Sequence, residues 1–458
     1  MTQPEAALAR FPEGFRWGTA TSAYQIEGSP LADGAGPSNW HRFSHTPGMV
    51  RDDATGDTAC DHYRRFPEDV ALMQDLGLNA YRFSLSWSRI LPAGTGAVNR
   101  AGLDFYSRLV DQLLKRGIEP CATLFHWDLP VALADRGGWL HPDIVSWFAA
   151  YARVVFEALG DRVPLWSTIN EPQVVVDAGY IHGSHPPGQR SLVEASLAAH
   201  HLLMAHGAAV RVYRETGCGK IGLVVNLEPK DPATGSPADR AAARRADAYM
   251  NRQYLDPVLL GRDPEDLAEV YGDARPRFPA EDFRLIGEPI DFLGINYYTR
   301  SVNRHDDSVP FLQAAPVRVP GAGYTETGWE VHPESLTRVL RWVRERYGDL
   351  PLYVTENGAA FPDPPQAEGG HLEDPLRADY LRRHLRAAHE ALAAGVDLRG
   401  YYVWSLLDNF EWAQGYSKRF GIVHVDFDTQ TRTPKASALV YRDIIRSGGE
   451  AVLAPPPV

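Results

Sequence analysis

The stretch Leu165-Trp-Ser-Thr-Ile-Asn-Glu-Pro172 decides the fold prediction, because it begins as a short strand-like run and then places a carboxylate, Glu171, directly after it. A second stretch, Leu352-Tyr-Val-Thr-Glu-Asn-Gly358, repeats this arrangement with Glu356, 185 positions further along the chain. Only a fold that gathers many strand ends at one mouth can bring two such distant carboxylates together.

Eight strand-like runs alternate with amphipathic helical patterns along the whole chain, as in β/α units around a parallel sheet. The runs cover residues 15–20, 79–84, 119–125, 165–170, 221–226, 292–296, 352–356 and 400–405. Apolar residues at helical spacing form two stripes, one of Leu103, Tyr106, Leu109, Val110, Leu113 and Leu114, the other of Leu336, Val339, Leu340 and Val343. Helix starts are expected near Asp143, Glu334 and Pro434.

Eight such units predict an α/β fold, the closed (β/α)8 or TIM barrel, for which about 250 residues is typical. The surplus of this 458-residue chain would form long βα loops around the active-site mouth. Because no low-complexity linker interrupts the pattern, we expect a single catalytic domain over residues 1–458, with a core at about 11–446 and short N-terminal and Pro-rich C-terminal tails. A doubly wound open sheet is the competing fold, but no glycine-rich phosphate motif follows the first strand.

Bulk properties narrow the classes of partner. The net charge of −12 argues against nucleic acid and anionic membranes, because no positive excess is available to meet phosphates. Cys60, Cys121 and Cys218 lack metal-ligand spacing and are predicted to be buried thiols. The first ten residues lack the features of a signal peptide, and no apolar run is long enough to span a membrane, so a cytoplasmic location is expected.

Polar or aromatic side chains follow nearly every predicted strand, at the end where barrels of this kind build their sites. They are Gln25, Arg82, His126, Asn170, Glu171, Asn226, Asn296, Tyr298, Glu356, Trp404, Glu411 and Trp412. A single Asn or His at such a place is usually a turn or structural residue, but the convergence of all twelve indicates a binding site. Amides, carboxylates and flat rings suit a sugar, which presents hydroxyls around a ring with apolar faces. Six tryptophans are predicted at this mouth, namely Trp40, Trp87, Trp127, Trp329, Trp404 and Trp412.

Several longer motifs carry a resemblance to a known family. They occupy residues 11–15 (FPEGF), 21–28 (TSAYQIEG), 81–89 (YRFSLSWSR), 124–128 (LFHWD), 294–298 (GINYY) and 404–412 (WSLLDNFEW), besides the two glutamate motifs NEP and TENG. In this order, the set resembles the family 1 glycoside hydrolases, the β-glucosidase and β-glycosidase group, over nearly the whole chain.

The resemblance implies a role for each matching position. Glu356 would be the catalytic nucleophile and Glu171 the catalytic acid/base. The substrate-binding set would be Gln25, His126, Asn170, Tyr298, Trp404, Glu411 and Trp412, with Trp404 as the platform under the non-reducing sugar. Arg82 and Asn296, together with Tyr298, would orient the nucleophile, and Trp329 would line the leaving-group side.

The family also implies retention of the β-configuration, with carboxyl carbons about 5–5.5 Å apart and no metal or organic cofactor. Glu171 must begin protonated and Glu356 ionised, so their surroundings have to separate their pKa values. The expected substrate is a small β-linked oligosaccharide or an aryl or alkyl β-glucoside, linked to carbohydrate metabolism and to cellulose or other polysaccharide degradation. Assembly as a homo-oligomer is compatible with an active site built from one chain.

Residue identity weighs against two neighbouring subtypes. Thioglucosidases of the family usually lack the acid/base glutamate, which is present here as Glu171. Phosphoglycosidases carry smaller residues in place of Glu411 and Trp412, and the carboxylate of Glu411 would repel a phosphate. Gln173 stands where many members carry Trp, and Arg300 stands where Ser is common; both departures concern the entrance and put the leaving-group preference in doubt. A transglycosidase using the same intermediate and a catalytically dead sugar-binding relative are the alternatives to hydrolysis.

Overall fold

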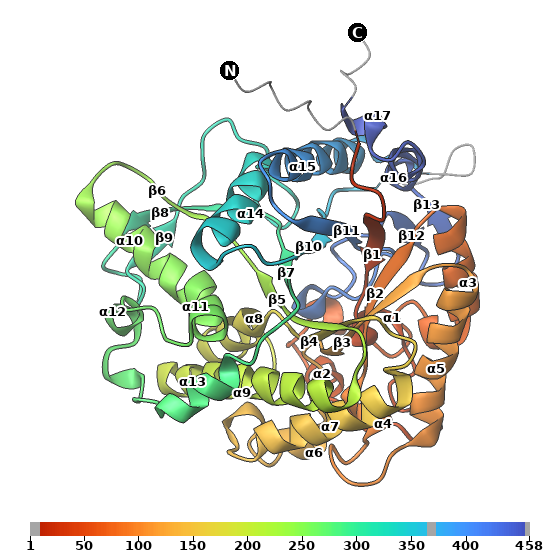
Figure 1. Cartoon of the computed structure of the whole chain (residues 1–458), viewed down its shortest axis with the longest axis horizontal. Coiled ribbons are helices and arrows are strands. Elements are labelled where there is room, and N and C mark those ends of the chain that lie inside the picture. The colour runs from red at the N-terminus through yellow and green to blue at the C-terminus, as the bar shows by residue number, and fades with distance from the viewer. Residues whose placement is uncertain (1–9, 364–371, 454–458) are drawn as a thin grey trace.

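The computed structural model describes residues 10–363 and 372–453, and within them eight parallel strands form a closed barrel with helices outside it (Figure 1). Around the barrel the strands follow the order β1, β2, β3, β4, β5, β7, β10, β11 and back to β1. Their bounds are β1 Arg16–Ala20, β2 Ala80–Ser84, β3 Glu119–Phe125, β4 Leu165–Asn170, β5 Lys220–Asn226, β7 Phe292–Asn296, β10 Leu352–Asn357 and β11 Leu398–Trp404. The predicted (β/α)8 barrel is confirmed, and each predicted strand lies within about two residues of an observed one.

Helices connect and cover the strands. They are α1 Ala23–Ile26, α2 Asn39–Ser44, α3 His62–Asp75, α4 Trp87–Ile90, α5 Arg100–Lys115, α6 Val131–Ala134, α7 Ile144–Leu159, α8 Pro172–Val176, α9 Leu192–Thr216, α10 Pro237–Asp247, α11 Gln253–Leu260, α12 Leu267–Tyr271, α13 Ala280–Ile286, α14 Glu334–Tyr347, α15 Pro375–Ala393, α16 Ala436–Arg446 and α17 Glu450–Leu453. Short single-turn helices are η1 Ala32–Gly34, η2 Arg51–Asp53, η3 Gly138–Leu140, η4 Asp177–Ile181, η5 Ala248–Arg252, η6 Gly272–Ala274 and η7 Trp412–Gln414. Outside the barrel, β6 Lys230–Pro232, β8 Ser301–His305 and β9 Ala314–Pro316 form one small sheet, and β12 Val423–Val425 pairs with β13 Arg432–Pro434.

The helical stripes behave as their spacing predicts, with one exception. All four apolar residues of the stripe on α14 are buried, as are five of the six on α5. The prediction that Leu114 is buried is wrong, because 42% of this residue is exposed. An α-helix has 3.6 residues per turn, so Leu114 is rotated away from the buried face that ends at Leu113. Its side chain therefore does not reach the barrel. Asp143 occupies the N-cap position of α7 and Glu334 begins α14, whereas α16 begins two residues after Pro434.

Two further predictions about burial need correction. Cys60 and Cys121 are buried thiols, but Cys218 is exposed in the turn between α9 and β5. Trp87 does not line the mouth: its ring is fully buried and stacks on Tyr151 of α7 at 4.8 Å between centroids. Trp87 begins α4 just after β2, and its ring packs against Phe148 and Tyr151 of α7 in the layer between the barrel and its helices.

Strand register places the two glutamate motifs beside their neighbours. Glu356 of β10 pairs with Asn296 at the end of β7, and Asn296 pairs in turn with Asn226 at the end of β5. The eight barrel strands are all parallel, so their C-terminal ends meet at one rim of the barrel. The register therefore brings side chains from strand ends as distant in sequence as Asn170 and Trp404 to the same rim of the barrel.

The predicted tails fall largely on residues 1–9 and 454–458, outside the described residues. Among the residues described, no helix combines the length and apolar character needed to cross a bilayer.

Candidate active site

Glu171 lies at the rim of the barrel, directly after β4 and at the start of α8. Its backbone is left-handed, with φ of 46°, an uncommon conformation for a residue with a side chain and one that clusters at functional sites. The carboxyl is buried, with 4% of the residue exposed, and its Oε1 accepts a hydrogen bond of 2.6 Å from Asn296 Nδ2. Burial, together with the charge of Glu356, raises the pKa of Glu171 to about 8, although the hydrogen bond from Asn296 opposes the rise.

Glu356 has a different set of partners. Arg82 of β2 donates from Nη1 to its Oε1 at 2.5 Å, and the hydroxyl of Tyr298 donates to its Oε2 at 2.6 Å. Burial raises the pKa of Glu356, while the Arg82 guanidinium and the Tyr298 hydroxyl act against this rise by stabilising the carboxylate. Glu356 is thus equipped to carry a charge, and Glu171, which lacks a cationic partner among the described residues, is equipped to hold a proton.

Two asparagines join the carboxyls into one network. Asn296 donates from Nδ2 to Glu171 Oε1 at 2.6 Å and to Asn170 Oδ1 at 3.0 Å. Asn170 Oδ1 accepts a second bond, of 2.6 Å, from Arg82 Nη2. Arg82 bridges Glu356 and Asn170, and Asn296 bridges Asn170 and Glu171, so neither carboxyl can turn away without breaking the network.

Gly358 shows why the motif after Glu356 ends in glycine. A Cβ at this position would lie 1.7 Å from the carbonyl oxygen of Trp404. The backbone that carries the nucleophile candidate and the backbone that carries the predicted platform therefore touch directly.

The predicted sugar-binding residues gather beside this network. Gln25 donates from Nε2 to the carbonyl of Phe410 at 2.9 Å and lies 3.5 Å from Glu411 Oε2. Burial and the charge of Glu356 raise the pKa of Glu411 to about 8, and Gln25 opposes the rise. The three residues belong to α1 and to the loop after β11, which the closed barrel makes neighbours.

His126 and two tryptophans form an aromatic wall. The His126 ring lies nearly parallel to both Trp404 and Trp412, at 5.9 and 6.0 Å between centroids. Its Nε2 faces Asn170 Nδ2 at 3.1 Å, and since the amide nitrogen is the donor, the imidazole proton belongs on Nδ1. Burial and the Arg82 charge hold the pKa of His126 well below its usual range, so the ring is neutral.

The three residues assigned to the entrance each have a defined partner. Trp329 packs on Tyr298 at 5.1 Å between ring centroids. Gln173, in α8, is buried and donates to the carbonyl of Asn226 at 2.6 Å, while Arg300 forms an ion pair with Glu330 at 3.0 Å. The side chain of Gln173 is thus fixed beside the end of β5, and the guanidinium of Arg300 is engaged by a carboxylate of its own.

Sequence reasoning did not assign three residues that the structure adds to the network. The Thr355 hydroxyl donates to Asn296 Oδ1 at 2.7 Å and fixes the amide orientation. Asn409 accepts from Gln25 at 3.1 Å. Trp127, expected only as part of the mouth, donates from Nε1 to the carbonyl of Asn170 at 2.8 Å. Thr355 directly precedes Glu356, and this position beside an assigned residue was the sequence signal that could have identified it.

Two buried carboxyls in unlike surroundings, within an amide and aromatic pocket at the mouth of a (β/α)8 barrel, define a class of barrel enzymes that combine a nucleophile with a general acid. Comparison with known proteins gives the particular family. The pattern described as Glycosyl hydrolase family 1 matches residues 7–450, and this chain belongs to that family of glycoside hydrolases.

The sequence similarity to known relatives extends over nearly the whole chain. Beta-glucosidase A of Thermotoga maritima is 49% identical over 444 residues, covering 96% of this chain and 99% of that protein. The 1,4-beta-D-glucan glucohydrolase of Thermotoga neapolitana is 48% identical, with the same coverage. Among solved structures, the beta-glucosidase from Thermotoga maritima in complex with glucoimidazole superposes with a TM-score of 0.94 at 49% identity, covering 96% of this chain and all of that one.

Proposed function

We propose that this protein is a retaining β-glucosidase that removes terminal non-reducing β-D-glucosyl residues from small β-linked oligosaccharides or glucosides. The observation that carries the proposal is the contrast between Glu171 and Glu356: one has its pKa raised to about 8, and the other is bonded to a guanidinium and a phenol. The relatives, named as a beta-glucosidase and a glucan glucohydrolase, support the substrate class.

In the first step, a carboxylate oxygen of Glu356 attacks the anomeric carbon. The bond from that carbon to the leaving oxygen breaks, and its electron pair takes the proton of Glu171, which acts as general acid. A sugar ester of Glu356 remains. Arg82 and Tyr298 hold the carboxylate in its attacking position, and the bonds they make weaken as its charge is consumed.

Loss of the Glu356 charge resets Glu171 for the second step. Burial and that charge both raise the pKa of Glu171, so removal of the charge lowers this pKa and shifts Glu171 toward its carboxylate form. The carboxylate now takes a proton from water, whose oxygen bonds to the anomeric carbon as the ester bond breaks. Two inversions return the β-configuration, and Glu356 is again ionised.

The pocket beside the pair would bind the sugar by its hydroxyls. Nδ1–H of His126 has no partner among the described residues and is free to donate to a hydroxyl. Glu411 would accept from hydroxyls, and such donors would stabilise its ionised form against the effect of burial. Asn170, pinned by Arg82 and Asn296, would contact the 2-hydroxyl, an interaction that strengthens in the transition state. Trp404 and Trp412 would supply the apolar surface.

Azide rescue tests the two roles separately. With an activated aryl β-glucoside, Glu356→Gly should yield the α-glucosyl azide, because azide replaces the nucleophile on the opposite face. Glu171→Ala should yield the β-azide, because azide attacks the glycosyl-enzyme that can no longer activate water. Glu119→Ala is the control: this carboxylate begins β3 at the other end of the barrel and should keep wild-type activity. Full activity in either site variant would overturn the assignment of the two roles. A wild-type protein that binds the glucoside without cleaving it would instead identify a sugar-binding relative.

Product analysis distinguishes hydrolysis from transfer. Incubation of the wild-type protein with cellobiose, lactose and laminaribiose should release free glucose from the β-glucosides at low substrate concentration. Longer oligosaccharides as the main products would instead identify a transglycosidase using the same intermediate. A single catalytic domain, a cytoplasmic location and assembly as a homo-oligomer stay predictions, open to limited proteolysis, cell fractionation and size-exclusion chromatography.

A further inference from the structure

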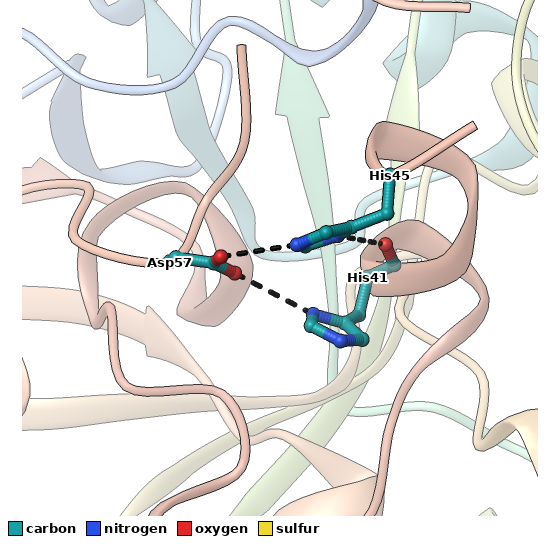
Figure 2. A group of neighbouring side chains, drawn as sticks. All are labelled: His41, His45 and Asp57. Carbon is teal, nitrogen blue, oxygen red and sulfur yellow. Dashed lines mark hydrogen bonds and ion pairs between the residues drawn. The ribbon is translucent and has the colours of Figure 1, made fainter. Parts of the chain in front are cut away.

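Two histidines and an aspartate converge at a place that the proposed reaction does not use. His41 lies within α2, His45 caps its C-terminal end, and Asp57 belongs to the loop before α3; Figure 2 shows all three side chains turned toward one another. One donor atom from each lies within 4.8 Å of the others. The two histidines are four positions apart, which places both on one face of the helix.

The hydrogen bonding fixes which nitrogen of His45 faces the cluster. Its Nδ1 lies 2.7 Å from the carbonyl oxygen of His41, and since a carbonyl only accepts, Nδ1 carries a proton. In the neutral ring, Nε2 is then a bare acceptor, and it lies 3.0 Å from Asp57 Oδ2, which is also an acceptor. Such a pair is stable only with a cation between the two atoms, either a proton or a metal ion.

His41 offers a second donor atom. Its Nδ1 is buried, has no hydrogen-bond partner among the described residues, and lies 3.6 Å from Asp57 Oδ1, too far for a hydrogen bond. This nitrogen therefore lies beside the carboxylate without being satisfied by a hydrogen bond within the described part of the chain.

The spacing suits tetrahedral coordination. Zinc binds imidazole nitrogen and carboxylate oxygen at about 2.0–2.2 Å, so neighbouring ligands of a tetrahedral ion lie about 3.4 Å apart. The carboxylate of Asp57 lies 3.0 Å from His45 Nε2 through Oδ2 and 3.6 Å from His41 Nδ1 through Oδ1, so its contacts with the two nitrogens fall on either side of this value. Small rotations of exposed side chains are enough to reach it, because His45 is 40% and Asp57 46% exposed.

The ligands sit on anchored backbone. The hydroxyl of Ser38 accepts from the His41 amide at 3.1 Å, and the carbonyl of Asp57 accepts from the Ser29 amide at 2.7 Å. The His41 carbonyl holds the His45 ring from the outside, as carbonyls commonly hold the free nitrogen of metal-bound histidines.

We propose that His41, His45 and Asp57 bind one divalent transition-metal ion, with Zn²⁺ as the preferred physiological ion and water in the remaining exposed position. Two imidazoles and one carboxylate favour zinc over Mg²⁺ or Ca²⁺, which prefer all-oxygen sites. The ion would clamp α2 to the loop before α3. Fixing α2 in this way would also affect the active-site mouth, because Trp40 of α2 packs against Trp412 at 4.6 Å between ring centroids.

A second group of side chains has similar spacing but differs from the proposed site in one respect. Asp363, Asp408 and His424 also converge, but the ammonium of Lys435 lies 2.7 Å from Asp363 Oδ2 and 2.8 Å from Asp408 Oδ1. That group already contains its own cation. In the cluster of His41, His45 and Asp57, the described residues place no Lys or Arg nitrogen within ion-pair distance of Asp57.

Metal titration of the whole protein tests the proposal, in a Cys218→Ser background that removes the exposed thiol. After treatment with EDTA and desalting, competition with a chromophoric chelator should reveal one Zn²⁺ site per chain. His45→Gln, His41→Gln and Asp57→Asn should each weaken it by at least about tenfold. Co²⁺ in the same site should give the visible absorption of a tetrahedral ion. Zinc at a hundredfold excess over its Kd should raise Tm by about 3 °C.

His305→Gln is the matched control, because the half-buried His305 forms a histidine–aspartate pair of its own with Asp307 at 3.1 Å. This variant should keep the wild-type zinc affinity, Co²⁺ spectrum and Tm shift. Equal zinc affinity in wild type and His45→Gln would overturn the proposal, as would the absence of any binding. In the latter case the bridge between His45 and Asp57 is a proton. Tm values measured in EDTA show that each variant is folded, so a lost site is not a lost fold.

Discussion

Replacement of Tyr298 by Phe should narrow the pH range of activity from the acid side alone. The Tyr298 hydroxyl donates to Glu356 Oε2 at 2.6 Å in a buried site. Burial and the charges of Glu356 and Glu171 raise the pKa of Tyr298 well above its usual range, so the hydroxyl remains a donor throughout the working pH range. The substitution removes this one donor and leaves the Arg82 bond in place.

The size of the effect follows from the bond that is lost. A hydrogen bond to a charged group contributes about 1.5–3 kcal/mol, and one pKa unit corresponds to about 1.4 kcal/mol. Loss of the phenol should therefore raise the pKa of Glu356 by about 1–2 units. Glu356 must be ionised to attack, so activity falls as the pH drops through its pKa. The acid limb of the profile should move to higher pH by the same 1–2 units.

The alkaline limb supplies an internal reference. Glu171 must be protonated at the start, and its pKa of about 8 predicts that activity falls as the pH rises through this value. Tyr298 is not among the groups that shift this pKa, so the alkaline limb should stay in place. The bell-shaped profile of kcat/KM, which reports the free enzyme, should thus become narrower rather than shift as a whole.

The assay is kcat/KM on an aryl β-glucoside between about pH 4 and 9, with Tyr297→Phe as the control. Tyr297 is the adjacent buried tyrosine, and its hydroxyl donates to the carbonyl of His332 at 2.6 Å, away from the carboxyls. Its profile should match that of wild type. An acid limb that stays in place in Tyr298→Phe, or that moves equally in both variants, would refute the reasoning.

Two further substitutions test the framework around the site. Lys435→Met removes a buried ammonium 2.8 Å from Asp408 Oδ1, and the uncompensated carboxylates should lower the free energy of unfolding by about 3 kcal/mol in urea denaturation. The exposed Lys115→Met should change it by less than about 0.5 kcal/mol, and equal losses would contradict the burial argument. Gly358→Ala should reduce kcat/KM by roughly 100-fold, because its Cβ would displace the carbonyl of Trp404; wild-type activity would show that the two segments do not touch.

Much of the fold could be predicted from the sequence, because strands and helices leave local, periodic signals. The runs around Glu171 and Glu356 were readable as strands from five or six residues each, and eight alternating units leave few closed arrangements. Side chains at the C-terminal ends of parallel strands meet at one rim whatever the loops do, so Arg82, Asn170 and Asn296 were predictable as neighbours. The predictions failed where a pattern did not show which side an element faces. Leu114 points outward, and Trp87 packs between layers.

The chemistry of the pair depends on distances that no local pattern contains. The sequence by itself determined that two carboxylates end two strands of one barrel. Only the tertiary structure decided that Glu356 receives Arg82 and Tyr298 while Glu171 receives only amide donors, because this division depends on strand register and on the closure of the barrel. The same holds for His41, His45 and Asp57, which lie on a short helix and a loop without periodicity and meet only after both segments fold against the barrel.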